Sequence, residues 1–166
     1  MASTSPWVEP MAKMSRVKGA TFERVLANLF KQMWPTAKRG IGQTRSASEV
    51  PDVDGTPFWV EAKHWKKTTR TGLRKAYQQA VDANRTTKPI VVIAKENCSR
   101  DIVVVMSALD FMSTFKGVTA SGLPHVQFYL DEFVQLCVKE KVGGARAPEV
   151  VSSDVDETQQ LEDAAS

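Results

Sequence analysis

Residues 51–65, PDVDGTPFWVEAKHW, place two carboxylates and a lysine in what the pattern predicts is a β-hairpin. Successive side chains on a strand point to opposite faces, so Glu61 and Lys63 share one face, about 7 Å apart along the strand. An Asp-Gly pair between the two strands is a hairpin turn signal. The turn folds the first strand back and brings Asp52 within cross-strand reach of Glu61. The spacing therefore predicts that Asp52, Glu61 and Lys63 lie together.

Two carboxylates held close together repel each other and favour a cation between them. Because the ligands offered are oxygens and no His or Cys cluster lies nearby, a hard ion such as Mg²⁺ is the natural candidate. A neighbouring lysine can orient a metal-bound water and stabilise negative charge developing on phosphorus. These parts predict hydrolysis of a phosphodiester. The alternative is an ordinary half-solvated hairpin, because Glu-x-Lys is common on exposed strand faces.

The hairpin is preceded by a helix that the pattern starts around Ser15. Apolar side chains recur every three or four residues and predict one buried stripe. The stripe comprises Phe22, Val25, Leu26, Leu29, Phe30 and Met33. Trp34-Pro35 ends this helix, since the residue before a proline avoids the α region. Residues 36–49 are expected to be a loop.

The remaining elements alternate between strands and helices. The pattern predicts strands at 50–53 and 57–65, a helix from about 73 to 84, and buried strands at 89–95 and 102–106. A short helix covers ALDFMSTF, and residues 126–141 hold a strand or helix followed by a helix. This mixture predicts an α/β fold, with a mixed central sheet flanked by helices.

The charge of the chain is unevenly distributed. The net charge is +3, but residues 147–166 contain six acidic residues and no Lys or Arg. Residues 1–146 therefore hold 22 basic and 13 acidic residues, a net charge of +9. A basic body indicates a polyanionic partner. The acidic end is expected to be disordered, and it serves either solubility or competition with nucleic acid for the basic face.

Length and composition predict one globular domain. The chain has 166 residues, of which 42% are hydrophobic and 25% charged. We expect an irregular arm at 1–14, a domain at 15–144 and the acidic tail at 145–166. No apolar run reaches the roughly 18 residues of a membrane span, and MASTSPWVEP lacks the features of a signal peptide. Cys98 and Cys137 lie outside any CxxC or Cys/His cluster, as expected of reduced thiols in a cytoplasmic protein.

Pro51-Asp52 followed by Glu61-Ala62-Lys63 resembles the motif of the PD-(D/E)xK nuclease superfamily. Residues 16–25, RVKGATFERV, resemble the first helix of archaeal-type Holliday junction resolvases, which begin with a Lys-Gly-x-x-x-Glu-Arg pattern. The resemblance covers roughly residues 15–106. It implies a restriction-endonuclease-like fold with an αβββαβ core.

The resemblance also implies roles for individual residues. Asp52 and Glu61 would be metal ligands together with the Ala62 carbonyl, and Lys63 would be the catalytic lysine. Glu23 would be the first-helix acid that reaches the metal site directly or through water. The metal would be Mg²⁺, with Mn²⁺ able to substitute for it.

Several site assignments have alternatives. Glu23 can instead be a surface carboxylate paired with Arg24 or Lys18. The superfamily often has a glutamine on the helix after the lysine; Gln78 and Gln79 are both available, and Gln79 is favoured. The resolvases also have a serine in the loop before the Pro-Asp pair, where the sequence offers Thr44, Ser46 and Ser48 and does not choose among them.

Basic residues flank the hairpin on three segments and predict a rim that contacts DNA phosphates. They are Arg16, Lys18, Lys38, Arg39, Arg45, Lys66, Lys67 and Arg70. Trp59 and Trp65, on the same strand face as Glu61, either stack on bases or pack under a helix. His64 falls on the opposite face from Glu61 and is not expected to be a ligand.

The sequence thus predicts a Mg²⁺-dependent endodeoxyribonuclease. Its most specific interpretation is a Holliday junction resolvase for DNA recombination and repair, acting on branched or duplex DNA. A homodimer would supply the two sites that paired nicks require. The alternatives are another nuclease of the same fold, a DNA-binding module without catalysis, and a protein-interaction adaptor, because fold alone does not choose a substrate.

Overall fold

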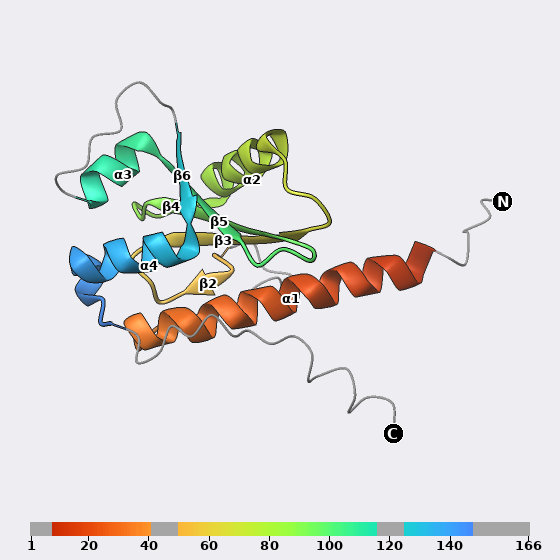
Figure 1. Ribbon diagram of the computed structural model, residues 1–166, viewed down its shortest axis with the longest axis horizontal. Coiled ribbons are helices and arrows are strands. Elements are labelled where there is room, and N and C mark those ends of the chain that lie inside the picture. Colours follow the sequence, from red (N-terminus) through yellow and green to blue (C-terminus); the bar gives the residue numbers. More distant parts are fainter. Residues whose placement is uncertain (1–7, 41–49, 116–124, 148–166) are drawn as a thin grey trace.

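The structure is a computed structural model that describes residues 8–40, 50–115 and 125–147, with side chains from Arg16 onward. It shows an α/β fold in which helices flank a mixed six-stranded sheet (Figure 1). The described elements are α1 (Val8–Met33), β1 (Lys38–Arg39), β2 (Val53–Asp54), β3 (Trp59–Trp65), α2 (Arg70–Ala83), β4 (Ile90–Glu96), β5 (Ile102–Ser107), α3 (Ala108–Thr114), β6 (His125–Tyr129), α4 (Leu130–Lys139) and the 3₁₀ turn η1 (Val142–Gly144).

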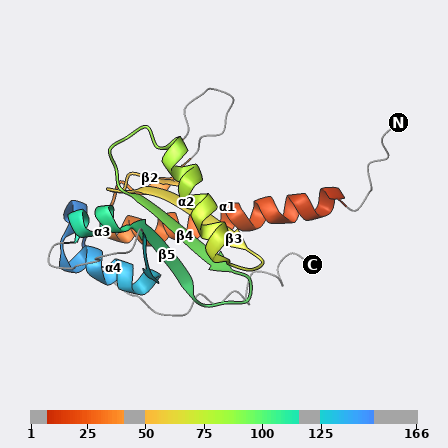
Figure 2. The same ribbon diagram turned by 90° about the horizontal axis from the view of Figure 1, so that it is seen from above.

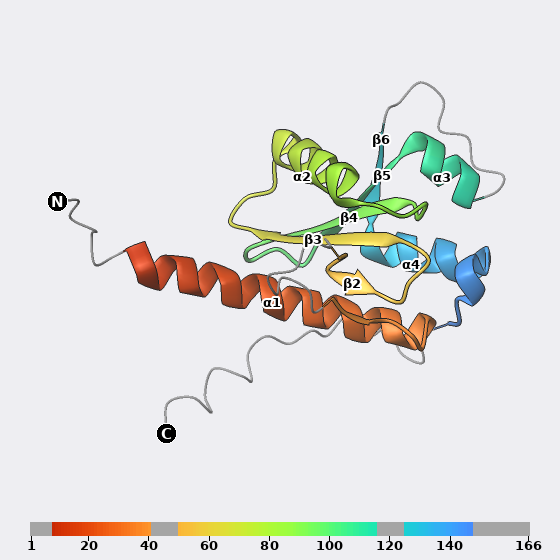
Figure 3. The same ribbon diagram turned by 180° about the vertical axis from the view of Figure 1, so that it is seen from behind.

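The strands of the sheet follow the order of the chain, from β1 at one edge to β6 at the other. β3 and β4 are parallel and are connected through α2, whereas the other neighbouring pairs are antiparallel. A parallel pair needs a crossover connection, which α2 supplies. Figures 1 and 3 place α2 on one side of the sheet and α1 on the other, and Figure 2 shows α2 crossing over β3 and β4.

Two apolar layers hold these helices to the sheet. Alternate side chains at the start of β3 and just before it divide between them: Phe58 and Val60 join the core under α1 and α4, and Trp59 joins the core under α2. This is the alternation that the sequence predicts for the strand. Trp59 and Trp65 therefore pack under α2. Of the two predicted alternatives, stacking on bases and packing under a helix, the structure shows the second.

Helix α1 is longer than the sequence predicts. It begins at Val8, not near Ser15, so residues 8–14 of the expected irregular arm are helical. All three views show this end of α1 projecting past the sheet (Figures 1–3). The predicted stripe is buried or half-buried except for Val25, which is 37% exposed, and the helix ends before Pro35 as expected.

Segment 36–49, expected to be a loop, contains the short strand β1, which pairs with β2. Two glycines allow the chain to pass close to itself here. A Cβ atom on Gly40 would lie 1.9 Å from the Pro51 carbonyl oxygen, and Gly55 adopts a φ of +77° in the predicted turn. Two-residue strands carry too little pattern to be recognised in sequence, which explains why β1 was missed.

The C-terminal third resolves an ambiguity of the sequence. Residues 125–129 form strand β6, and α4 follows at once. The body of the protein extends past the expected boundary at Gly144: Ala145 is 8% exposed and packs in the core, and the Arg146 N–H donates to the Met33 carbonyl at 3.2 Å. The first residues assigned to the acidic tail thus belong to the fold.

Cys98 is exposed, Cys137 is buried, and neither forms a disulfide, as expected. Within the described ranges, no helix is long and apolar enough to span a membrane. The expectations for residues 1–7, for Arg45, Thr44, Ser46 and Ser48 in segment 41–49, and for the acidic sequence from 148 onward lie outside the described residues.

Candidate active site

Asp52 is held against the edge of β3 by two hydrogen bonds. Its backbone N–H donates to the Val60 carbonyl at 2.9 Å, and its Oδ2 accepts from the Ala62 N–H at 2.7 Å. Because Val53 pairs with Val60 in antiparallel register, Asp52 falls opposite Glu61. The predicted cross-strand position of these two acids is confirmed.

The surroundings of Asp52 disfavour its charge. Burial of the carboxyl raises its pKa most, and the neighbouring Glu61 and Glu23 carboxylates raise it further. The Ala62 N–H and the Lys63 ammonium act in the opposite direction, and the pKa settles at about 7. A site that brings one buried carboxyl near two others is one in which a bound cation would relieve repulsion.

Glu61 and Lys63 lie on one face of β3 and form an ion pair. The Lys63 Nζ is 2.5 Å from the Glu61 Oε1, and their side chains are 24% and 12% exposed. The alternative interpretation of Glu-x-Lys was a solvated strand face, on which both side chains would be largely exposed. The low exposures of Glu61 and Lys63 do not agree with it. Because removing two charges from water costs free energy, such a pair on an edge of the site calls for a functional explanation.

Glu23 reaches the site from α1 and is paired with Arg39 of β1. The Arg39 Nε donates to the Glu23 Oε2 at 2.8 Å, and the Glu23 side chain is 20% exposed. The partner is thus Arg39, and not the Arg24 or Lys18 that the surface alternative named. The ion pair connects helix α1 to the edge of the sheet and keeps Glu23 within electrostatic range of Asp52.

The oxygen donors around Asp52 suit a hard divalent cation. The N–H and C=O of one strand residue point to the same side, so the Ala62 carbonyl faces the side from which its N–H contacts Asp52. Asp52, Glu61 and this carbonyl would hold the ion. Among the described residues, however, no three His, Cys, Asp or Glu side chains are gathered as a metal site. Glu23 is paired with Arg39, and Glu61 with Lys63.

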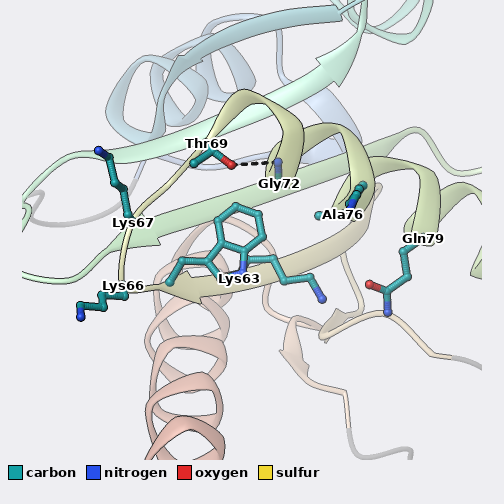
Figure 4. A pocket seen from close by; sticks show the side chains of 9 residues that line it. Lys63, Lys66, Lys67, Thr69, Gly72, Ala76 and Gln79 are labelled. Carbon is teal, nitrogen blue, oxygen red and sulfur yellow. Dashed lines mark hydrogen bonds between the residues drawn. The ribbon is translucent and has the colours of Figure 1, made fainter.

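Of the two glutamines on α2, Gln79 lies beside Lys63. Figure 4 shows the Lys63 ammonium extending toward the Gln79 side chain across an open concavity that both residues line. Gln78 instead donates to Asp82 on its own helix at 2.9 Å. The preference for Gln79 therefore agrees with its position.

The predicted DNA-facing residues lie on several elements. Arg16, Lys18, Lys38 and Arg70 are exposed, and Lys66 and Lys67 are exposed at the end of β3. Arg39 differs, because it is engaged by Glu23. His64 lies on the α1 side, its ring 5.8 Å from that of Phe22, which agrees with its exclusion as a ligand.

Two contributors to the site were missed in the sequence. Lys75 lines the same concavity as Lys63 and Gln79, and its spacing of four residues from Gln79 on one helix face was the available signal. Gly40 was the second. Its N–H donates to the Asp52 carbonyl at 2.8 Å, so the backbone around Asp52 is fixed from the β1 side as well.

No protein-family model matches this chain, and neither a curated protein nor a solved structure shows a significant match. The geometry of the described residues, together with the motif they carry, is therefore the ground for assigning a function.

Proposed function

We propose that this protein is a Mg²⁺-dependent DNA endonuclease of the PD-(D/E)xK type. The observation that carries the proposal is the position of Asp52: its buried carboxyl is fixed by the Ala62 N–H opposite Glu61, and its pKa is raised to about 7. Like-charged groups confined in this way cost folding free energy, and a metal-binding role explains the cost.

Each side chain then has a definite task. Asp52, Glu61 and the Ala62 carbonyl would hold the ion, which, when bound, would supply a water activated for attack on phosphorus. Glu61 currently neutralises Lys63; when Glu61 serves as a ligand, the ammonium can face the phosphate and stabilise its developing charge. Gln79 lines the same concavity as Lys63 and would help to orient the lysine and the phosphate.

The order of the first six described elements supports a restriction-endonuclease-like core. α1, β1, β2, β3, α2 and β4 follow one another as helix, three strands, helix and strand, which is the order implied by the resemblance. Glu23 lies on α1, Asp52 lies just before β2, and Glu61 and Lys63 lie on β3. The resemblance implies the same placement, with one acid on the first helix and the others on the hairpin.

The more specific proposal is a Holliday junction resolvase that acts as a homodimer. It is supported by Lys18, Gly19, Glu23 and Arg24 on α1, and by the place of Glu23 near Asp52. Paired nicks need two sites, which two-fold symmetry supplies.

The test is cleavage of a labelled four-way junction in Mg²⁺, beside a linear duplex of the same arm sequence. Symmetric nicks near the branch point, with the duplex intact, are expected. Cutting of both substrates would retain the endonuclease and remove the junction specificity. Binding without cleavage in either Mg²⁺ or Mn²⁺ would favour the DNA-binding module instead.

A further inference from the structure

An open concavity of about 630 Å³ lies between the end of β3 and the first turns of α2. Figure 4 shows its arrangement: Lys63 and Gln79 lie on one side, and Lys66 and Lys67 extend from the opposite end. Its nine lining residues include Lys63, Trp65, Lys66, Lys67, Lys75 and Gln79.

Four of the nine lining residues are lysines, and none is a carboxylate. Of these, only Lys63 is in an ion pair among the described residues; Lys66, Lys67 and Lys75 are exposed and form none. Like charges gathered in a hollow repel one another, and a hollow focuses their field on an incoming anion. This lining therefore suits a polyanion and disfavours a cation.

One aromatic side chain, that of Trp65, lines the concavity. Trp65 is half-buried and packs against the α2 core, with its ring 3.5 Å from the position a Cβ on Gly72 would take. Its remaining exposed surface faces the hollow that the lysines line. A nucleotide within a strand is recognised by two kinds of group together. Cations bind its phosphate, and an aromatic face contacts its sugar or base.

We infer that this concavity, the lysine pocket, binds a phosphate of the nucleic-acid strand next to the phosphate that is cut. Lys66 and Lys75 contact that neighbouring phosphate from two walls, and Trp65 packs against its nucleotide. The inference rests on the proposed function, because Lys63 belongs both to the pocket and to the proposed catalytic set. Holding a neighbouring phosphate fixes the position of the strand, and so the position of the cut.

The test compares two variants with the same loss of charge. Lys66→Gln/Lys75→Gln removes two pocket lysines, and Lys31→Gln/Lys139→Gln removes two exposed lysines of α1 and α4, on the other side of the sheet from α2. Binding of a fluorescent DNA strand is measured in EDTA over a range of salt, so that no cleavage is needed. Melting curves of both variants establish that each is folded.

We expect the pocket variant to lose about tenfold or more in affinity and its log–log salt slope to shrink by about 0.7–0.9 per lysine, while the control pair stays near the wild type. Equal losses in the two variants would overturn the pocket, because diffuse charge would explain both. An unchanged pocket variant would overturn it as well.

Two further arms separate the alternatives. The first arm measures the melting temperature of the wild type and of the pocket variant as inorganic phosphate is added. The strand assignment would be overturned if phosphate raised the melting temperature of the wild type alone while both proteins bound DNA equally well. In Mg²⁺, the pocket variant should cut at scattered positions. If the wild type does not cut DNA but the pocket variant still loses affinity in EDTA, the proposed function fails and the phosphate site stands. If the pocket variant cuts at the normal position and binds DNA as the wild type does, the phosphate site fails and the proposed function stands.

Discussion

At the scale of single residues, the site concentrates charges that the fold would be more stable without. Asp52 is buried beside Glu61 and Glu23, and its pKa of about 7 lies well above the ordinary value of 3.8 for an aspartate side chain. Between these two pH values the folded protein keeps a proton that the unfolded chain has released. Stability in the absence of metal therefore falls as the pH rises from about 4 to about 7.

Asp52→Asn should remove this pH dependence. The amide oxygen can still accept from the Ala62 N–H, but it carries no charge to bury. In metal-free buffer at pH 8 the variant should melt above the wild type, by about 2–4 °C for each kcal/mol recovered, and the two should converge near pH 4. Melting curves over this range measure it. A variant that is less stable than the wild type at pH 8 would show that the charge is compensated in the folded protein.

Lys63→Met tests the lysine separately from the metal ligands. Loss of a donor that stabilises developing charge typically slows the chemical step by about 10²–10³-fold, and single-turnover cleavage should show this with DNA affinity nearly unchanged. Lys139→Met, at an exposed lysine of α4 outside the DNA-facing set and the lysine pocket, is the matched control. Equal slowing by both variants would contradict the assigned role of Lys63.

At the scale of elements, the site depends on the close contact between β1 and the segment before β2. A Cβ on Gly40 would lie 1.9 Å from the Pro51 carbonyl oxygen, so Gly40→Ala should displace Asp52. We expect a destabilisation of about 1–3 kcal/mol together with loss of cleavage. Gly19→Ala, whose Cβ meets nothing nearer than 3.9 Å, should leave stability unchanged or raise it. Chemical denaturation compares the two, and an unaffected Gly40→Ala variant would refute this role of β1.

The segment after α4 closes one end of the fold. The Trp34 Nε1 donates to the Val142 carbonyl at 3.0 Å, and Ala145 packs in the core. A chain ending at Lys141 should lose several degrees of melting temperature, because it exposes Trp34 and leaves its N–H unpaired. A chain ending at Ala147 retains these contacts and should melt with the full chain. Identical melting of both truncations would mean that the segment contributes nothing.

Elements with a strong period were predictable, and elements fixed by tertiary contacts were not. The stripe of α1 and the alternation of β3 follow directly from sequence spacing. β1 has only two residues, and the start of α1 projects past the sheet, so neither leaves an apolar pattern to read. The same division holds at the site: spacing placed Asp52 opposite Glu61, whereas the Glu23–Arg39 pair and the place of Lys75 depend on how distant elements pack.

At the scale of the whole molecule, a basic body of residues 1–146 is joined to an acidic end. The exposed cations that the sequence predicts to face DNA lie on α1, on β1 and around the start of α2. They therefore lie on α1, which carries Glu23, and on elements that neighbour Asp52 and Glu61 in the chain or in the sheet. Binding to DNA should therefore weaken steeply with salt, whatever structure the DNA has. Under the proposed function, the charge of the whole body would supply the affinity for DNA, and the residues around Asp52 would supply the chemistry.

The measurement that tests the central claim most directly is single-turnover cleavage of labelled junction DNA by the wild type and by Asp52→Asn, at protein concentrations that saturate both. The account predicts that the wild type cleaves in Mg²⁺, and that Asp52→Asn binds equally well and does not cleave. Equal cleavage rates for the two proteins would contradict it, as would a wild type that binds the DNA and cuts it in neither Mg²⁺ nor Mn²⁺.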